Sequence, residues 1–252
     1  MLRFLDCNMA VGMPNATSGW RIYEPDAVCK EAEKCGIVHG FAYHNSGLDL
    51  HPINGNAEMD LIAHNNPFFS ATWAIMPNHT GEFFDADVLH HKLDENHVEL
   101  VRLFPRYNSL SYSLSDWCMG EYLTMLERRG TPVLINQDQI DWEDIHSMCC
   151  AHPQLKVIIT NLYYRHARYL LALMHTHDHL YAETSGMKSF DLLQTFCEKC
   201  GADRLVFGSN LGTFSAGSAV CIVNYALITE QEKEKIAHAT LETLLGRQVV
   251  EQ

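Results

Sequence analysis

Positive charge is scarce in this sequence. The 252 residues include 18 lysines and arginines against 31 aspartates and glutamates, which gives a formal net charge of −13. A field of that sign repels phosphate backbones and anionic lipid headgroups. We therefore expect neither nucleic acid nor a membrane surface as a partner, although a local group of arginines still allows an anionic small molecule to bind.

Long apolar runs are also missing. No stretch approaches the roughly 20 apolar residues that a membrane-spanning helix needs. Arg3 and Asp6 interrupt the first apolar run, which is untypical of a signal peptide. The nine cysteines are an odd number without the spacing of a disulfide framework, as is usual for reduced thiols. We expect a cytoplasmic protein.

Linkers and low-complexity tracts are absent, and short apolar runs alternate with amphipathic stretches throughout. The expected strands are 2–6, 37–43, 68–76, 98–104, 132–136, 155–160, 180–183 and 204–208. The expected helices are 25–35, 57–65, 86–96, 115–129, 142–151, 165–175, 189–200 and 230–245. Such alternation predicts a parallel sheet, and eight strands close a barrel of this length. We predict an α/β fold, a single-domain (β/α)8 TIM barrel over residues 1–252. An open doubly wound sheet is the alternative, but no GxGxxG motif follows the first strand.

In such a barrel, function lies at the carboxyl ends of the strands. The polar residues expected there include many amides and few carboxylates or histidines. They are Asn8, His44, Asn45, Asn78, His79, Arg102, Arg106, Asn136, Gln137, Asn161, Glu183, Ser185, Ser209 and Asn210.

Several segments, taken in chain order, resemble the amidohydrolase-related branch of the amidohydrolase superfamily. The run 205–208 with Ser209 and Asn210, followed by the helix before Gly246, is similar to a family strand that ends Gly-Ser-Asp and its later helix. Segments 132–136 and 152–161 resemble strands that usually end in histidine, and residues 6–10 stand where the family has Asp-x-His-x-His. Segments 101–104 and 181–186 also fit. The resemblance spans the chain and implies a TIM-barrel hydrolase.

The resemblance also implies where metal ligands would lie, and the residues there differ from the family pattern. The corresponding positions hold Asn8, Ala10, Asn136, Asn161 and Asn210. None offers an imidazole or carboxylate, the donors that zinc prefers beside thiolate. Asn210 replaces the family's aspartate base, and an amide cannot take a proton near neutral pH. We therefore expect no metal and no other cofactor at the barrel mouth.

The amides and arginines at the mouth are the candidate ligand-binding residues. Amides donate and accept hydrogen bonds, so Asn8, Asn136, Asn161 and Asn210 are predicted to bind a polar ligand; the alternative is a water-filled cavity left by a lost metal. Arginine binds carboxylates bidentately. Since lactonase members of the family hold acidic substrates with basic residues here, Arg102 and Arg106 resemble a substrate clamp; the alternative is an ion pair with Asp138 or Glu183.

Three residues are candidate general bases. His44 and His79 end the second and third strands, and histidine titrates near neutrality. Glu183 is the third, if burial raises its pKa. Each of the three has an alternative structural interpretation.

Three further motifs are weaker. His175, His177 and His179 have the spacing of a zinc-binding His-x-His pair, but they precede the seventh strand at the bottom of the barrel, where a structural role is expected. Cys197 and Cys200 form a lone CxxC. The glycines and hydroxyls of 212–218 would suit an anion on backbone N–H groups, or only a flexible connection.

Two functions follow, and a third, a metal enzyme that uses unfamiliar ligands, stays open. The first is a metal-independent hydrolase acting on a small carboxylated molecule such as a lactone, ester or amide. The second is a pseudoenzyme, a barrel that binds a metabolite without turnover. Both have a small molecule as partner, and the sequence leaves open whether the protein forms a homo-oligomer.

Overall fold

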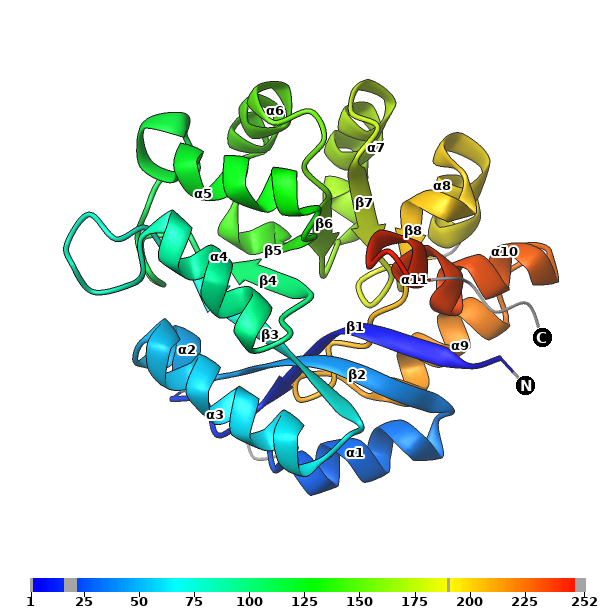
Figure 1. Ribbon diagram of the computed structural model, residues 1–252. Helices are drawn as coiled ribbons and strands as arrows, with labels where there is room; N and C mark the ends of the chain where they lie inside the picture. The colour runs from blue at the N-terminus through cyan, green and yellow to red at the C-terminus, as the bar shows by residue number, and fades with distance from the viewer. Residues whose placement is uncertain (1, 16–21, 190, 248–252) are drawn as a thin grey trace.

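The computed structural model describes residues 2–15, 22–189 and 191–247, and these form an eight-stranded parallel barrel surrounded by helices (Figure 1). The strands are β1 (Phe4–Val11), β2 (Ile37–His44), β3 (Phe69–Ile75), β4 (Leu100–Leu103), β5 (Val133–Asn136), β6 (Val157–Thr160), β7 (Leu180–Glu183) and β8 (Leu205–Val206). The α-helices are α1 (Pro25–Lys34), α2 (Ser46–Asp49), α3 (Pro52–Asn65), α4 (Ala86–Glu95), α5 (Asp116–Arg129), α6 (Trp142–Ala151), α7 (Ala167–Thr176), α8 (Leu192–Cys200), α9 (Ala216–Asn224), α10 (Glu230–Glu234) and α11 (Thr240–Leu244).

The strands pair in sequence order, and β8 returns to β1. The backbone N–H of Cys7 donates to the Phe207 carbonyl at 3.1 Å, and that of Ala10 donates to the Leu211 carbonyl at 3.0 Å. These bonds close the ring beyond the short strand β8. The predicted (β/α)8 TIM barrel is confirmed.

The alternation of side chains along each strand separates an inner from an outer core. Outward residues such as Val101 and Leu103 pack beneath the helices. Inward residues form a second apolar cluster that fills the barrel: Leu5, Cys7, Phe41, Leu100, Leu134, Ile158 and Val206. Side chains on a strand repeat their direction every two residues. The next inward residues, two positions closer to the carboxyl ends of the strands, are polar: Arg102, Asn136, Thr160 and Glu183. The two-residue repeat of the strands thus places the candidate site directly above the inner apolar cluster.

Some element boundaries differ from the predicted ones. β1 runs to Val11 instead of ending at residue 6, because Asp6 and Asn8 are buried inside the barrel and do not mark a loop. α3 begins at Pro52, five residues before the predicted start at residue 57, with the His51 ring accepting from the backbone N–H of Ile53. The expected helix 189–200 begins at Leu192, and Phe190 lies outside the described residues.

The expected helix 230–245 contains a π-helical segment, Lys235–Ala239. The wider turn leaves the carbonyl of Ile236 to accept a hydrogen bond at 3.0 Å from the backbone N–H of Phe207, directly after β8. The π-turn therefore joins the last helices to the last strand of the barrel.

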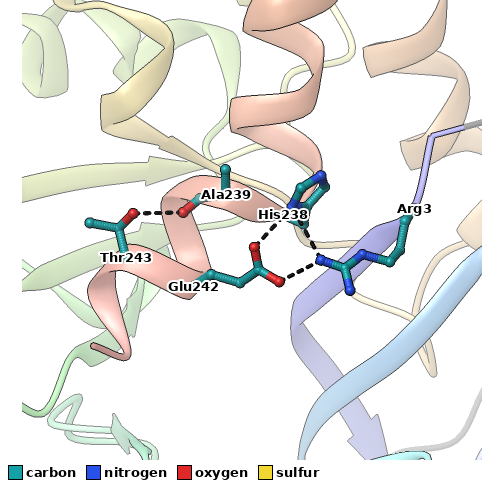
Figure 2. A network of polar contacts seen from close by, with 5 residues as sticks. All are labelled: Arg3, His238, Ala239, Glu242 and Thr243. Atoms are coloured by element: carbon teal, nitrogen blue, oxygen red, sulfur yellow. Dashed lines mark hydrogen bonds and ion pairs between the residues drawn. The ribbon is translucent and has the colours of Figure 1, made fainter. Parts of the chain in front are cut away.

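An ion pair joins the first strand to these last helices (Figure 2). The guanidinium of Arg3 lies 2.5 Å from the carboxylate of Glu242, which also lies 3.0 Å from Nδ1 of His238. Glu242 is only 7% exposed, but the Arg3 side chain is 39% exposed, so water still reaches one partner of this pair. Among the described residues, no helix is long and apolar enough to cross a membrane.

Candidate functional site

Asn8 links residues from three strands at the mouth of the barrel. Its Oδ1 accepts a hydrogen bond from Nη2 of Arg102 on β4 at 2.6 Å. Its Nδ2 donates to Oε2 of Glu183 on β7 at 3.1 Å and to Oδ1 of Asn161 after β6 at 3.4 Å. Asn8 therefore bridges a buried cation and a buried carboxylate.

Glu183 is fully buried and receives several donors. Its Oε2 accepts from the backbone N–H of Asn161 at 3.0 Å and from the Ser185 hydroxyl at 2.8 Å, and its Oε1 accepts from the backbone N–H of Ser185. Burial raises the pKa of Glu183, while these bonds act in the opposite direction. Gly208 leaves room for the carboxylate, because a Cβ there would lie 2.5 Å from Oε1. The surroundings hold Glu183 as a structural acceptor with little capacity left for a substrate proton.

Arg102 is buried without a counterion. It is 2% exposed, and no carboxylate in the described part of the chain lies within 4.0 Å of its guanidinium nitrogens. Its Nε has no hydrogen-bond partner, and the ring of Tyr43 covers the guanidinium with its centroid 4.7 Å from Cζ. The alternative considered from the sequence, an ion pair with Asp138 or Glu183, is not formed. Burying a charge without a counterion costs roughly several kcal/mol. The Arg102 guanidinium is therefore the group of this site that most needs a functional explanation.

The other predicted binding residues do not join this network. Arg106 is exposed and donates to the backbone carbonyl of Asp138, away from Arg102. Asn136 accepts a weak hydrogen bond from the backbone N–H of Asp138 at 3.4 Å. Asn210 has a φ of +52° and begins a turn. Its backbone carbonyl accepts hydrogen bonds from the N–H groups of Thr213 and Phe214. The structure brings together Asn8, Asn161, Arg102 and Glu183.

The two candidate histidines have partners of their own. Nδ1 of His44 lies 2.7 Å from the Ser46 hydroxyl, and burial lowers the pKa of this histidine. His79 is exposed, and its Nε2 lies 3.0 Å from the carbonyl oxygen of Cys118. It lines a cavity of about 620 Å³ beside the ends of β3 and β4. Neither histidine is hydrogen-bonded to Asn8, Arg102 or Glu183.

Asp6 belongs to the site but was not among the sequence candidates. Its Oδ1 accepts from the backbone N–H groups of Asn8 at 2.9 Å and Ser209 at 3.1 Å, while its buried Oδ2 has no partner. Burial raises the pKa of Asp6 to about 7. Its place as the aspartate of the Asp-x-His-x-His-like segment was the signal that it lies inside the barrel.

The raised pKa of Asp6 predicts a pH-dependent stability. The folded protein keeps this proton up to about pH 7, whereas the unfolded chain releases it near pH 4. Between these values the native state binds more protons, so the free energy of unfolding should fall as pH rises, by about 1.4 kcal/mol per pH unit from this group. Asp6→Asn should flatten the profile over that range in urea unfolding experiments. Parallel profiles for wild type and variant would show that Asp6 titrates normally.

A second cavity of about 490 Å³ opens beside the ends of β6, β7 and β8. It is lined by Tyr163, Tyr164, Arg165, His166, Gly186, Lys188, Ser189 and Phe214. Nζ of Lys188 lies 3.5 Å from the centroid of the Phe214 ring. Aromatic faces and cationic groups therefore surround this space. The sequence analysis pointed to this region only through the loop 212–218, which contains Phe214 and was a candidate anion site.

The amide oxygens at the mouth are already engaged in hydrogen bonds. The amide oxygen of Asn8 accepts from a guanidinium, and that of Asn161 accepts from the Asn8 amide. Within the described ranges, no cluster of three His, Cys, Asp or Glu ligand atoms lies at the mouth. Arg102 already supplies a fixed positive charge, which disfavours a second cation nearby.

Comparisons with known proteins bear on the fold. No family model and no curated protein matches the chain, but solved structures do. A 5-carboxyvanillate decarboxylase from Sphingomonas paucimobilis superposes with a TM-score of 0.77 at 12% identity, covering 98% of this chain and 100% of that one. An amidohydrolase II structure has a TM-score of 0.72 at 16% identity, covering 97% and 100%. A dihydroxybenzoic acid decarboxylase from Polaromonas sp., with bound manganese and 2-nitroresorcinol, has a TM-score of 0.75 at 13% identity, covering 98% and 97%.

These TM-scores establish a shared fold. The chain has the TIM-barrel architecture of the amidohydrolase-type proteins, as the sequence motifs predicted. The solved structures that share this architecture are named as decarboxylases and as an amidohydrolase, so the fold alone does not select a reaction.

Proposed function

We propose that this protein is a barrel that binds a small carboxylated molecule at its mouth, anchored by Arg102, without a metal at the ligand positions implied by the fold. The observation that carries the proposal is the unpaired guanidinium of Arg102 at 2% exposure. A ligand carboxylate would supply the missing counterion in the bidentate geometry that arginine favours.

Tyr43 is the side chain that a ligand would have to displace. Its ring lies over the guanidinium and packs against Phe104 with ring centroids 5.4 Å apart. Because the anchor is covered, association should be slower than the typical 10⁵–10⁷ M⁻¹s⁻¹, roughly, of preformed sites. A planar ligand would replace the stacking that Tyr43 gives up.

A binding role without turnover agrees with the state of the candidate bases. Glu183 is engaged by its donors, and His44 and His79 each have a local partner. Several structural neighbours are decarboxylases whose names denote carboxylated aromatic substrates. This supports aromatic acids as the first ligands to test.

The test is isothermal titration calorimetry with benzoate, hydroxybenzoates and short aliphatic acids, each beside its uncharged primary amide. We expect acids to bind and the amides to bind about 100-fold more weakly, because they lack the charge that pairs with Arg102. Arg106→Ala is the matched control and should bind as wild type does. Equal affinity for acids and amides would refute the anchor.

The second candidate is hydrolysis of a lactone, ester or amide that carries a carboxylate. Burial raises the pKa of Glu183, and it raises the pKa of Asp6 to about 7. A buried acid such as Asp6, with a pKa near neutrality, can exchange protons during turnover, which favours this candidate. Product formation from the same panel, followed by NMR across pH, separates the two. Turnover that Glu183→Gln abolishes while binding persists would replace the binding proposal with this one.

A further inference from the structure

We propose that His146, Cys150 and His177 form a binding site for a zinc-like transition metal on the outside of the barrel, far in the fold from the mouth. His146 and Cys150 lie four residues apart on α6, so they share one face of the helix. His177 caps the carboxyl end of α7. Their potential ligand atoms all lie within 4.8 Å of one another.

The distances suit a tetrahedral metal. Nδ1 of His146 lies 2.9 Å from Nε2 of His177, and Sγ of Cys150 lies 3.8 Å from Nε2 and 4.0 Å from Nδ1 of His146. Zinc bonds of roughly 2.0–2.1 Å to nitrogen and 2.3 Å to sulfur put neighbouring tetrahedral ligands about 3.3–3.6 Å apart. The remaining distance, between Cys150 and His177, is at most 4.8 Å, so side-chain movements of up to about an ångström would complete the geometry.

The chemistry of the set selects the metal class. Two imidazoles and a thiolate favour zinc and copper over magnesium or calcium, which prefer oxygen ligands. Cys150 is exposed, whereas the two histidines are half-buried. The fourth coordination position therefore faces solvent and is suited to a water molecule.

The backbone that carries His177 is held in place. The guanidinium of Arg204 donates to the His177 carbonyl at 2.5 Å and, through Nε, to the Leu180 carbonyl at 3.0 Å. The backbone N–H of His177 donates to the Leu173 carbonyl and so continues the helical hydrogen bonds of α7. Since the backbone is already ordered, a metal here would mainly fix side chains, and it would link α6 to the turn before β7.

In the structure, the histidines before β7 do not act together as the His-x-His spacing of the sequence would suggest. Nδ1 of His175 donates a hydrogen bond to the Leu171 carbonyl at 2.6 Å, so His175 is not part of the cluster. The partner of His177 comes from α6, 31 residues earlier. The two imidazoles share a hydrogen bond, and Sγ of Cys150 lies beside the His146 ring.

Cobalt titration of the metal-free protein tests the site, because Co²⁺ bound to a thiolate gives a charge-transfer band in the near ultraviolet. We expect the band to saturate at one equivalent and to disappear when Zn²⁺ is added. Cys150→Ser should abolish it, and His177→Ala should weaken cobalt binding about 10-fold or more.

Two controls make the outcome decisive. Cys221→Ser removes another exposed cysteine, and His175→Ala removes the neighbouring exposed histidine; both should keep the wild-type band. Cys150 is exposed, so its serine variant should fold normally, which circular dichroism checks. Absence of the band in wild type, or its persistence in Cys150→Ser, would overturn the proposal.

Discussion

Replacing Glu183 with alanine should lower the free energy of unfolding by roughly 3–5 kcal/mol. The carboxylate accepts from the backbone N–H groups of Asn161 and Ser185, from the Ser185 hydroxyl and from Asn8. Alanine would leave these buried donors unsatisfied. Urea unfolding followed by circular dichroism measures the loss.

Two variants calibrate this result. Ser185→Ala removes one hydroxyl donor and should cost only about 1 kcal/mol. Glu198→Ala, at an exposed position on α8, should stay within about 0.5 kcal/mol of wild type. A loss below about 1 kcal/mol for Glu183→Ala would mean that the network contributes little to stability, and Glu183 would again be a candidate base.

Much of the fold could be predicted because it depends on local patterns. The eight alternations and their order survive in the structure, since each apolar run is long enough to be buried on both faces of a parallel strand. The inner position of Glu183 also follows from period two in Leu180–Glu183. The extent of β1 could not be predicted, because Asp6 and Asn8 are polar residues buried in mid-strand.

The candidate site was predicted less completely, because its partners come from distant parts of the chain. The sequence indicated Asn8, Arg102, Asn161 and Glu183 separately, but Arg102 and Asn8 are 94 residues apart, and their hydrogen bond depends on barrel closure. Arg102 and Arg106 looked equivalent in sequence. The strand buries the first, and the loop after it exposes the second.

Asn8 stands where the amidohydrolase pattern that the sequence resembles would have its first metal ligand, and the group that contacts its amide oxygen is a guanidinium. A positive charge is therefore present at the mouth, attached covalently to β4. Such a charge can pair with a carboxylate, but it cannot generate the hydroxide that a metal-bound water supplies.

Arg102→Met is the sharpest test of this view. It should weaken carboxylate binding about 100-fold or more while changing the free energy of unfolding by only about 1 kcal/mol. Methionine fills a similar volume and removes the cost of burying an unpaired charge. That gain offsets the lost hydrogen bond to Asn8 and the lost contact with Tyr43. Calorimetry and urea unfolding on the same preparation measure both quantities, with Arg106→Met as control.

Removing Glu183 and removing Arg102 should therefore affect different properties of the protein. Glu183 accepts several hydrogen bonds within the protein, so its loss should be felt mainly in stability. Arg102 keeps an unpaired Nε, so its loss should be felt mainly in ligand affinity. If Arg102→Met instead destabilised the protein by roughly 3 kcal/mol and left binding unchanged, the guanidinium would be a structural partner of Asn8, and the ligand would have to bind elsewhere. The cavity beside Lys188 and Phe214 would then be the place to test, with Lys188→Met as the first variant.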